Sequence, residues 1–284
     1  MLSVLIPVED CEMLPAVLGT GMRFARRYGA YVEGAWLRPD PTAAAFQTDM
    51  GAAPVVLPDL ERETWEAVAK TRDAFREALA AHGLGGPGPG PELGRPGMPA
   101  SNFRSDAAAG DADLARYARL FDVAVLGQPD PRAAAPRRST FETVLFESGR
   151  PVLLAPPVAP ETIGDTVVVA WNGSTETART LAFARPLLQD ARRIVILSVE
   201  GGMVDGPEGT DVVRALRRVG LNAEARHVAG DGDTGRSILR ECRTLGADLL
   251  IKGAYTQSRL RQMIFGGATS LIIQMAHLPV LMAH

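Results

Sequence analysis

Cysteine and histidine are scarce in this chain, and their placement excludes whole classes of site. The sequence has two cysteines, Cys11 and Cys242, which are too few and too far apart for a disulfide framework or a cysteine zinc site. Cys11 is either a reactive thiol near a strand end or an ordinary small residue, and the frequent burial of free cysteine favours the second interpretation. The histidines show neither metal-ligand spacing nor a partnered nucleophile: His82, His227, His277 and His284. The sequence therefore predicts no metal centre.

Long apolar runs and strong net charge are missing as well. No run reaches the roughly 18 residues that a membrane span requires, and the opening segment, Met1–Asp10, lacks the basic start of a secretory signal. The net charge is -3 and the isoelectric point is near 5.9, so nothing attracts the chain generally to nucleic acid or to an anionic membrane. We therefore expect a soluble, cytoplasmic protein without a nucleic-acid or membrane partner.

The short motifs of common catalytic centres are also lacking. The sequence contains no G-x-S-x-G elbow, no Walker loop and no H-E-x-x-H pair. Asp231 and Asp233 resemble a pair of catalytic acids, but they flank a glycine just before a helical segment, which is typical of a turn and a helix N-cap. We therefore expect no enzyme activity.

What the sequence does contain is an internal repeat. Each half opens on a short apolar run that ends in polar residues, at Leu2–Glu9 and at Thr166–Ser174. Each half later has an apolar run that begins with Asp and ends with Gly, at 122–127 and at 248–253. Each half closes on a Pro-Val-Leu strand, at 151–155 and at 279–283. A chain of 284 residues also exceeds what one core usually fills. The sequence therefore predicts a tandem duplication, with domains at 1–157 and 164–284.

The second half alternates between strands and helices. Strands are expected at 167–170, 193–199, 223–228, 248–253 and 280–283, and helices at 175–188, 210–219, 233–245 and 266–275. Continuous apolar runs indicate strands buried on both faces, and the intervening helices indicate right-handed crossovers in a parallel sheet. The predicted fold class is α/β: two doubly wound, Rossmann-like domains, each a five-stranded parallel sheet flanked by helices.

The first half follows the same plan with additions. Helices are expected at 15–28, 59–82 and 111–120, and strands at 31–37 and 122–126. The Gly/Pro-rich segment 85–97 fits neither helix nor inner strand, because proline lacks the amide hydrogen. It is either a plain surface loop or a lid or partner-binding segment.

The segment 253–269 is the candidate ligand loop, because ligands of doubly wound sheets lie beyond the carboxyl ends of the strands. Gly253 lets a ligand approach the backbone closely. Gly266 and Gly267 open the last helix, whose unpaired N–H groups and dipole favour an anion. Hydroxyl groups and positive charge come from Thr256, Ser258, Thr269, Arg259 and Arg261. The set suits the phosphates of a nucleotide; the alternative is that the glycines only allow a tight turn and close helix packing.

The same segment resembles the signature loop of universal stress proteins, Gly-x2-Gly-x9-Gly-Ser/Thr, which a helix and a Pro-Val-Leu strand follow. The resemblance covers nearly the whole second half and the core of the first. Aligned on Gly253, the second Gly falls on Thr256, the third on Gly266 and the Ser/Thr on Gly267, so two of the four positions depart. Family members with an intact loop bind ATP, so the resemblance implies ATP or another adenine nucleotide as the ligand.

The resemblance also implies contacts outside the loop. The family has an Asp at the end of the first strand, where this chain has Asn172 in its second half and Glu9 in its first. Asn172 can hydrogen-bond a base edge or a ribose hydroxyl, or it can belong to a turn that caps the next helix. The residues expected to contact the nucleotide are Asn172, Val199, Gly253, Thr256, Ser258, Arg259, Gly266, Gly267, Ala268 and Thr269.

The matching segment of the first half, 127–141, keeps Gly127 but loses the paired glycines. Three prolines remove amides that a phosphate would use, at positions 129, 131 and 136. The basic side chains of Arg132, Arg137 and Arg138 either attract an anion or form a solvated basic loop. We expect this first site to be degenerate.

Three functions remain open. The resemblance implies a regulatory protein of the stress response that binds a nucleotide and a protein partner, with at most very slow ATP hydrolysis because no general base is evident. The second is a tandem adaptor module that has lost nucleotide binding. The third, supported by fold analogy alone, is a nucleotide-using enzyme or a flavoprotein subunit. In each case the strands Val152–Ala155 and Val280–Ala283 are expected to pair within the chain as a pseudo-dimer, and a homodimer of chains is left open.

Overall fold

The computed structural model describes residues 2–37, 57–84, 101–108, 110–130, 135–254 and 267–284. Their contacts divide the chain into two compact units, Met1–Ser148 (unit 1) and Gly149–His284 (unit 2). The expected loop at 85–97 lies outside the described residues.

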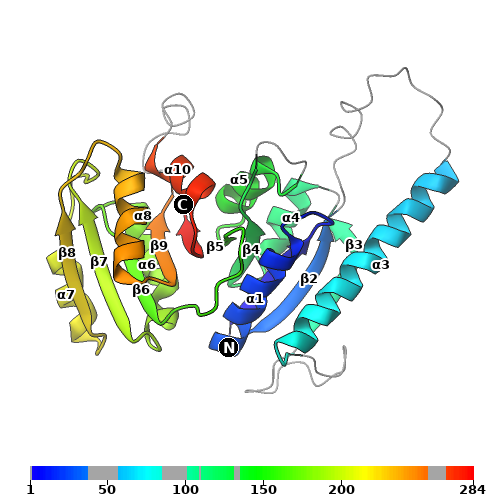
Figure 1. The fold of residues 1–284 in the computed structure, drawn as a ribbon, viewed down its shortest axis with the longest axis horizontal. Helices are drawn as coiled ribbons and strands as arrows, with labels where there is room; N and C mark the ends of the chain where they lie inside the picture. The colour runs from blue at the N-terminus through cyan, green and yellow to red at the C-terminus, as the bar shows by residue number, and fades with distance from the viewer. Residues whose placement is uncertain (1, 38–56, 85–100, 109, 131–134, 255–266) are drawn as a thin grey trace. The chain divides into compact units, whose positions relative to one another are not determined.

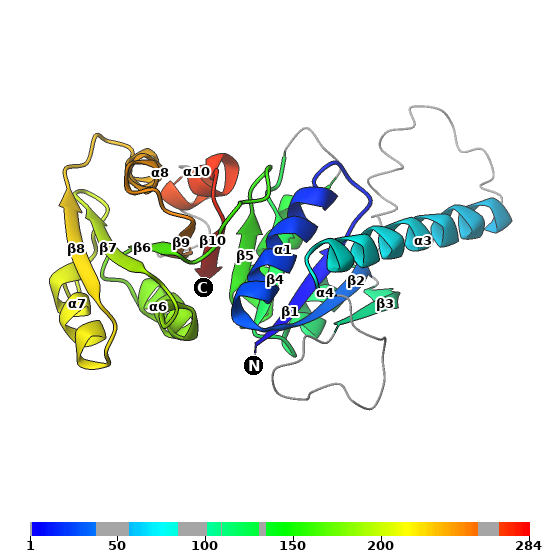
Figure 2. The same ribbon diagram turned by 60° about the horizontal axis from the view of Figure 1, so that its bottom comes forward.

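Unit 1 is a parallel sheet with helices on both faces. Its strands are β1 (Ser3–Val8), β2 (Tyr31–Leu37), β3 (Ser101–Ala108) and β4 (Val123–Gly127), in the order β3-β2-β1-β4. Its described helices are α1 (Leu14–Tyr28), α3 (Leu57–Ala81), α4 (Asp111–Ala118) and α5 (Arg138–Glu147). The strands separate α1 and α3 from α4 (Figure 2). Residues Val4–Val8 of β1 are all buried, as expected for a strand covered on both faces.

The sequence analysis did not locate two elements of unit 1. β3 reads Ser-Asn-Phe-Arg-Ser-Asp-Ala-Ala and has no apolar run. Among the described strands it lies at the edge of the sheet, where it pairs with β2. Its Phe103 ring packs on Phe75 of α3, with the ring centroids 5.6 Å apart. α5 begins at Arg138, inside the segment predicted to be a loop through residue 141.

Unit 2 contains a complete five-stranded parallel sheet of the predicted kind. Its strands are β5 (Val152–Ala155), β6 (Thr166–Ala170), β7 (Arg193–Val199), β8 (Ala223–Val228), β9 (Leu249–Gly253) and β10 (Val280–Ala283), in the order β5-β10-β9-β6-β7-β8. Its described helices are α6 (Thr175–Leu188), α7 (Gly209–Arg218), α8 (Thr234–Leu245) and α10 (Ala268–Met275). α8 and α10 lie on the opposite side of the strands from α6 and α7 (Figures 1 and 2).

The two Pro-Val-Leu strands pair with each other. β5 runs antiparallel to β10, with Val280 opposite Leu154 and Met282 opposite Val152, whereas β6 to β10 are mutually parallel. The predicted pairing of the two closing strands is therefore confirmed. By its contacts β5 belongs to unit 2, while the division into domains at 1–157 and 164–284 stays a prediction.

A repeated aspartate explains one landmark of the duplication. In unit 1, Asp122 accepts hydrogen bonds from the backbone N–H and the hydroxyl of Ser3, at 2.8 and 2.9 Å. In unit 2, Asp248 accepts from the backbone N–H groups of Asp165 and Thr166, at 3.1 and 2.9 Å. Each aspartate thus satisfies donors at the start of the first strand of its half, which would otherwise lose a partner on burial.

None of the described helices is both long and apolar enough to cross a membrane. Among the same residues, no group of three or more acidic, histidine or cysteine side chains is placed to hold a metal ion.

Candidate functional site

The carboxyl ends of three neighbouring strands define the candidate site in unit 2. β6 lies between β7 and β9, with Ala170 opposite both Leu197 and Lys252. Asn172 follows β6, while Val199 and Gly253 end β7 and β9. The structure therefore brings these three predicted residues to one edge of the sheet. Thr256, Ser258, Arg259 and Gly266, also predicted, lie outside the described residues.

Asn172 organises the turn between β6 and α6. Its Oδ1 accepts hydrogen bonds from the hydroxyl of Thr177 at 2.7 Å and from the backbone N–H of Ser174 at 3.2 Å. Ser174 is the N-cap of α6, and its hydroxyl oxygen accepts from the backbone N–H of Thr177. The capping interpretation of Asn172 is therefore observed, and its contact with a ligand stays a prediction.

Gly253 lies against the first turn of α6. A Cβ built at this position would fall 2.5 Å from the backbone nitrogen of Thr177 and 2.8 Å from its hydroxyl oxygen. Real Cβ contacts are longer than this, so only glycine fits here without moving the helix. Close helix packing therefore accounts for Gly253 by itself.

The start of α10 lacks a side-chain cap. Gly267 is the N-cap, with φ -128° and ψ 172°, and among the described residues no side chain accepts a hydrogen bond from the first turn. Unpaired N–H groups at a helix start carry partial positive charge. Ala268 begins the helix, and the buried Thr269 turns toward β9, as its bond to Lys252 shows. These are the three predicted residues of α10 and its cap.

Lys252 lies in the candidate site and was not among the residues predicted from the sequence. It is 9% exposed near the end of β9, and its Nζ donates to the carbonyl oxygen of Gly253 and to Oγ1 of Thr269, both at 2.8 Å. Burial lowers the pKa of its ammonium group from 10.5 to about 8. One signal was available in the sequence, because Lys252 interrupts the apolar run that predicts β9.

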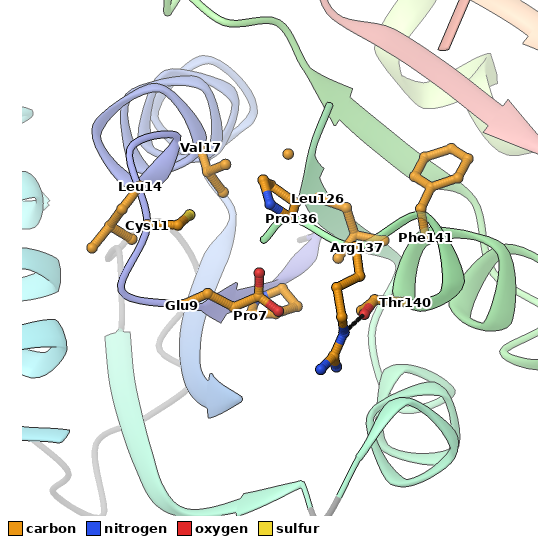
Figure 3. Close-up of a pocket in the computed structure, with 11 residues that line it drawn as sticks. Pro7, Glu9, Cys11, Leu14, Val17, Leu126, Pro136, Arg137, Thr140 and Phe141 are labelled. Carbon is orange, nitrogen blue, oxygen red and sulfur yellow. Dashed lines mark hydrogen bonds between the residues drawn. The ribbon is translucent and has the colours of Figure 1, made fainter. Parts of the chain in front are cut away.

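Unit 1 has a small pocket at the corresponding strand ends. It lies beyond β1 and β4 and is lined by Pro7, Glu9, Cys11, Leu14, Val17, Leu126, Gly127, Pro136, Arg137, Thr140 and Phe141 (Figure 3). Its cavity of about 20 Å³ holds roughly one water molecule.

Pro136 fills the space above Gly127. A Cβ at Gly127 would lie 2.5 Å from Cγ of Pro136 and 2.9 Å from a methyl group of Val17. In this kind of fold the end of β4 would face a ligand. Here it is covered by the ring of Pro136 and the side chain of Val17. This geometry favours the expectation that the first site is degenerate.

The ionisable groups of this pocket are perturbed by burial. Burial raises the pKa of Glu9 to about 7, although the positive charge of Arg137 opposes the shift. No described residue donates a hydrogen bond to the Glu9 carboxylate. Burial also raises the pKa of the Cys11 thiol, which disfavours the reactive thiolate.

Two of the three arginines in the matching segment of the first half form ion pairs. Arg137 donates to Asp111 at 2.6 Å and to the hydroxyl of Thr140 at 3.2 Å, and Thr140 in turn donates to Asp111 at 2.7 Å. Arg138 pairs with Glu142 one turn along α5 at 2.8 Å. The third, Arg132, lies outside the described residues.

Comparison with known proteins gives the family of the second half. Residues 164–284 match the model of the Universal stress protein family. A universal stress protein from Archaeoglobus fulgidus DSM 4304 is 15% identical, with 99% of this chain and 96% of that chain covered and a TM-score of 0.69. A putative universal stress protein from Pseudomonas aeruginosa UCBPP-PA14 is 14% identical, with 100% and 93% covered and a TM-score of 0.49. A universal stress protein solved in complex with cAMP is 19% identical, with 42% and 97% covered and a TM-score of 0.34. No curated protein matches the chain.

The likeness to the Archaeoglobus structure confirms the predicted α/β fold class over nearly the full length of the chain. The family match, which rests on sequence, covers all five parallel strands of unit 2, from β6 to β10. Residues 164–284 therefore belong to the universal stress protein family.

Proposed function

We propose that this chain is a tandem universal stress protein of the cytoplasm whose second domain, residues 164–284, binds ATP or another adenine nucleotide. Nucleotide binding would regulate contacts with a protein partner in the stress response. The observation that carries the proposal is the uncapped start of α10, which lies at the same edge of the sheet as the end of β9.

The start of α10 suits an anion for a local reason. The first N–H groups of a helix have no intrahelical acceptor, and a capping side chain usually supplies one. Gly267 has no side chain to do so, which leaves these donors for a ligand. A phosphate group is the anion that a nucleotide would bring to this position.

The proposal assigns one nucleotide to each chain. In the first domain, residues 1–157, Pro136 and Val17 occupy the space above Gly127, and the cavity of about 20 Å³ is far smaller than a nucleotide. The first domain then acts as a structural or partner-binding half. A homodimer of chains is part of the same proposal, and light scattering on the eluted protein tests it.

Catalysis is not part of the proposed function beyond very slow ATP hydrolysis. At the end of β6 this chain has Asn172, whose amide cannot act as a general base. Its Oδ1 already accepts two hydrogen bonds from the turn.

Calorimetric titration of ATP into wild type and two substitutions of Gly267 tests the proposal. The backbone there is extended, and both Asp and Asn are favoured N-caps, so Gly267→Asp and Gly267→Asn should fold alike. The two side chains have nearly the same shape and differ in charge. We expect Gly267→Asp to weaken ATP binding at least tenfold through repulsion of the phosphates, and Gly267→Asn to weaken it much less.

If Gly267→Asp and Gly267→Asn weaken ATP binding equally, the start of α10 does not bind the phosphates. If wild type binds no ATP at millimolar concentration, the second candidate, a tandem adaptor without nucleotide binding, takes its place. One observation favours that candidate: packing and capping already account for Gly253 and Asn172.

A further inference from the structure

Lys252 places a positive charge in the interior of unit 2. The three residues before it in β9, Leu249, Leu250 and Ile251, are fully buried, and Lys252 itself is 9% exposed. Its ammonium group has three hydrogens, and two of them are donated to neutral oxygens, those of Gly253 and Thr269. The third has no acceptor among the residues that the structure describes.

No carboxylate in the described part of the chain balances this charge. Among the described residues, no Asp or Glu forms an ion pair with Lys252, and burial is the one cause of its lowered pKa. The segment that joins β9 to α10 cannot supply the missing charge either, because residues 249–284 contain no Asp or Glu at all. The same stretch adds Arg259 and Arg261, which are positive.

A second source of positive potential lies beside the ammonium group. Nζ of Lys252 is 2.8 Å from Oγ1 of Thr269, which is in the first turn of α10. The uncapped N–H groups of that turn form the positive end of the helix dipole. The buried ammonium group therefore lies beside the positive end of a helix, although a buried charge without an ionic partner costs several kcal/mol.

We infer that the buried ammonium group of Lys252 binds a phosphate group of the ligand of this site, together with the first turn of α10 and the hydroxyl of Thr269. The inference rests on the proposed nucleotide site and deepens it, since it names the side chain that recognises the phosphate.

The chemistry of the three groups fits a phosphate. Lysine is a common phosphate binder that acts as a point charge, and a helix start donates backbone N–H groups to the same kind of anion. Because Oγ1 of Thr269 accepts a hydrogen bond from Lys252, its own hydrogen is left to donate to a phosphate oxygen. A metal cation, by contrast, would be repelled by both the ammonium group and the helix dipole.

The chain offers an internal control, because it contains two lysines. Lys70 lies on the exposed face of α3, with 68% of its side chain exposed, and pairs with Asp10 at 2.8 Å. Selective ¹³Cε labelling of lysine therefore yields two signals whose pKa values can be followed separately by NMR. The titrations use the full chain with ATP, AMP, adenosine, inorganic phosphate, or no addition.

We expect ATP, AMP and phosphate to raise the pKa of Lys252 by one unit or more, and adenosine to leave it unchanged. None of the four ligands should shift the signal of Lys70. A rise of one unit corresponds to tenfold tighter binding of the anion to the charged amine than to the neutral one. In calorimetry, Lys252→Met, which keeps the unbranched apolar stem, should lose at least tenfold in ATP affinity. Its affinity for adenosine should equal that of wild type.

The outcomes separate this inference from the proposed function. ATP that binds wild type and Lys252→Met equally, without moving the pKa of Lys252, overturns the inference and leaves nucleotide binding standing. Phosphate that moves this pKa in a chain that binds no nucleotide supports the phosphate site and removes the nucleotide function. If ATP does not bind to wild type and phosphate does not move the pKa of Lys252, both the inference and the proposed function fail.

Discussion

Replacing Lys252 by Met should make the stability of unit 2 less dependent on pH. In the folded chain, burial lowers the pKa of the Lys252 ammonium group from 10.5 to about 8, whereas in the unfolded chain the group is solvated. Between these two values the unfolded state binds a proton that the folded state does not. The free energy of unfolding of wild type should therefore rise as the pH rises from about 8 toward 10.5.

The magnitude follows from the two pKa values. A fall from 10.5 to about 8, at about 1.4 kcal/mol for each pKa unit, means that the charged amine costs the folded state about 3 kcal/mol near pH 7. Most of this cost is gone by about pH 10, so the difference in unfolding free energy between wild type and Lys252→Met should change by about 2 to 3 kcal/mol. The neutral amine still donates to Gly253 and Thr269, so the hydrogen bonds lost in the variant cancel from this comparison.

The assay is urea unfolding of unit 2, followed by tryptophan fluorescence. The chain has three tryptophans, and Trp171, buried beside β6, is the one in unit 2. Replacing Trp36 and Trp65 by Phe leaves Trp171 as the reporter of this unit. Wild type and Lys252→Met are compared in that background at pH 7 and pH 10, in a buffer without phosphate.

A difference that stays the same at pH 7 and pH 10 would refute the reasoning, because it would mean that the folded and unfolded chains hold the Lys252 proton equally. All other titrating groups are shared by the two proteins and drop out. Adding phosphate to wild type should reduce the pH dependence if the anion pairs with the ammonium group.

Two further substitutions test the packing and the charges around the strand ends. Gly253→Ala should destabilise unit 2 by about 1 to 3 kcal/mol, because its Cβ would meet the backbone of Thr177 at 2.5 Å; an unchanged urea midpoint of Trp171 fluorescence would contradict this close approach. In unit 1, the raised pKa of Glu9 means that the folded state holds a proton that the unfolded state has released, so stability should fall by about 2 kcal/mol as the pH rises from 4.5 to about 7. In urea unfolding followed by Trp36 fluorescence, Glu9→Gln should abolish this fall in stability, while Glu12→Gln, at an exposed position, should keep it. A fall in stability that persists in Glu9→Gln would assign it to another group.

The sequence predicted most of unit 2 because its signals are local. Apolar runs locate β6, β7, β9 and β10, whereas β8 was expected at its observed place although its sequence, Ala-Glu-Ala-Arg-His-Val, is mostly polar. The helices between the strands begin and end within a few residues of the expected positions. Asp233 is the N-cap of α8, as its position before the helical segment predicted, and accepts from the backbone N–H of Arg236 at 3.1 Å. The repeat of Asp122 and Asp248 was also visible in the sequence. The sequence did not show its cause, which is that each aspartate accepts hydrogen bonds at the start of the first strand of its half.

The sequence missed elements whose pattern is weak. β3 is an edge strand with polar side chains, and the start of α5 follows a proline-rich stretch that reads as a loop. Neither has the continuous apolar periodicity from which an element can be predicted.

By itself, the sequence determined the duplication, the alternating α/β order and the position of a glycine-bearing loop at the strand ends, because each depends on residues close together in the chain. Tertiary structure alone decided what the key residues do. The contact of Gly253 with α6, the cover of Pro136 over Gly127 and the burial of Lys252 beside α10 each join segments that are far apart in sequence or whose approach no local pattern specifies. The sequence shows that Lys252 is charged, but only the fold shows that no carboxylate of the described residues pairs with it.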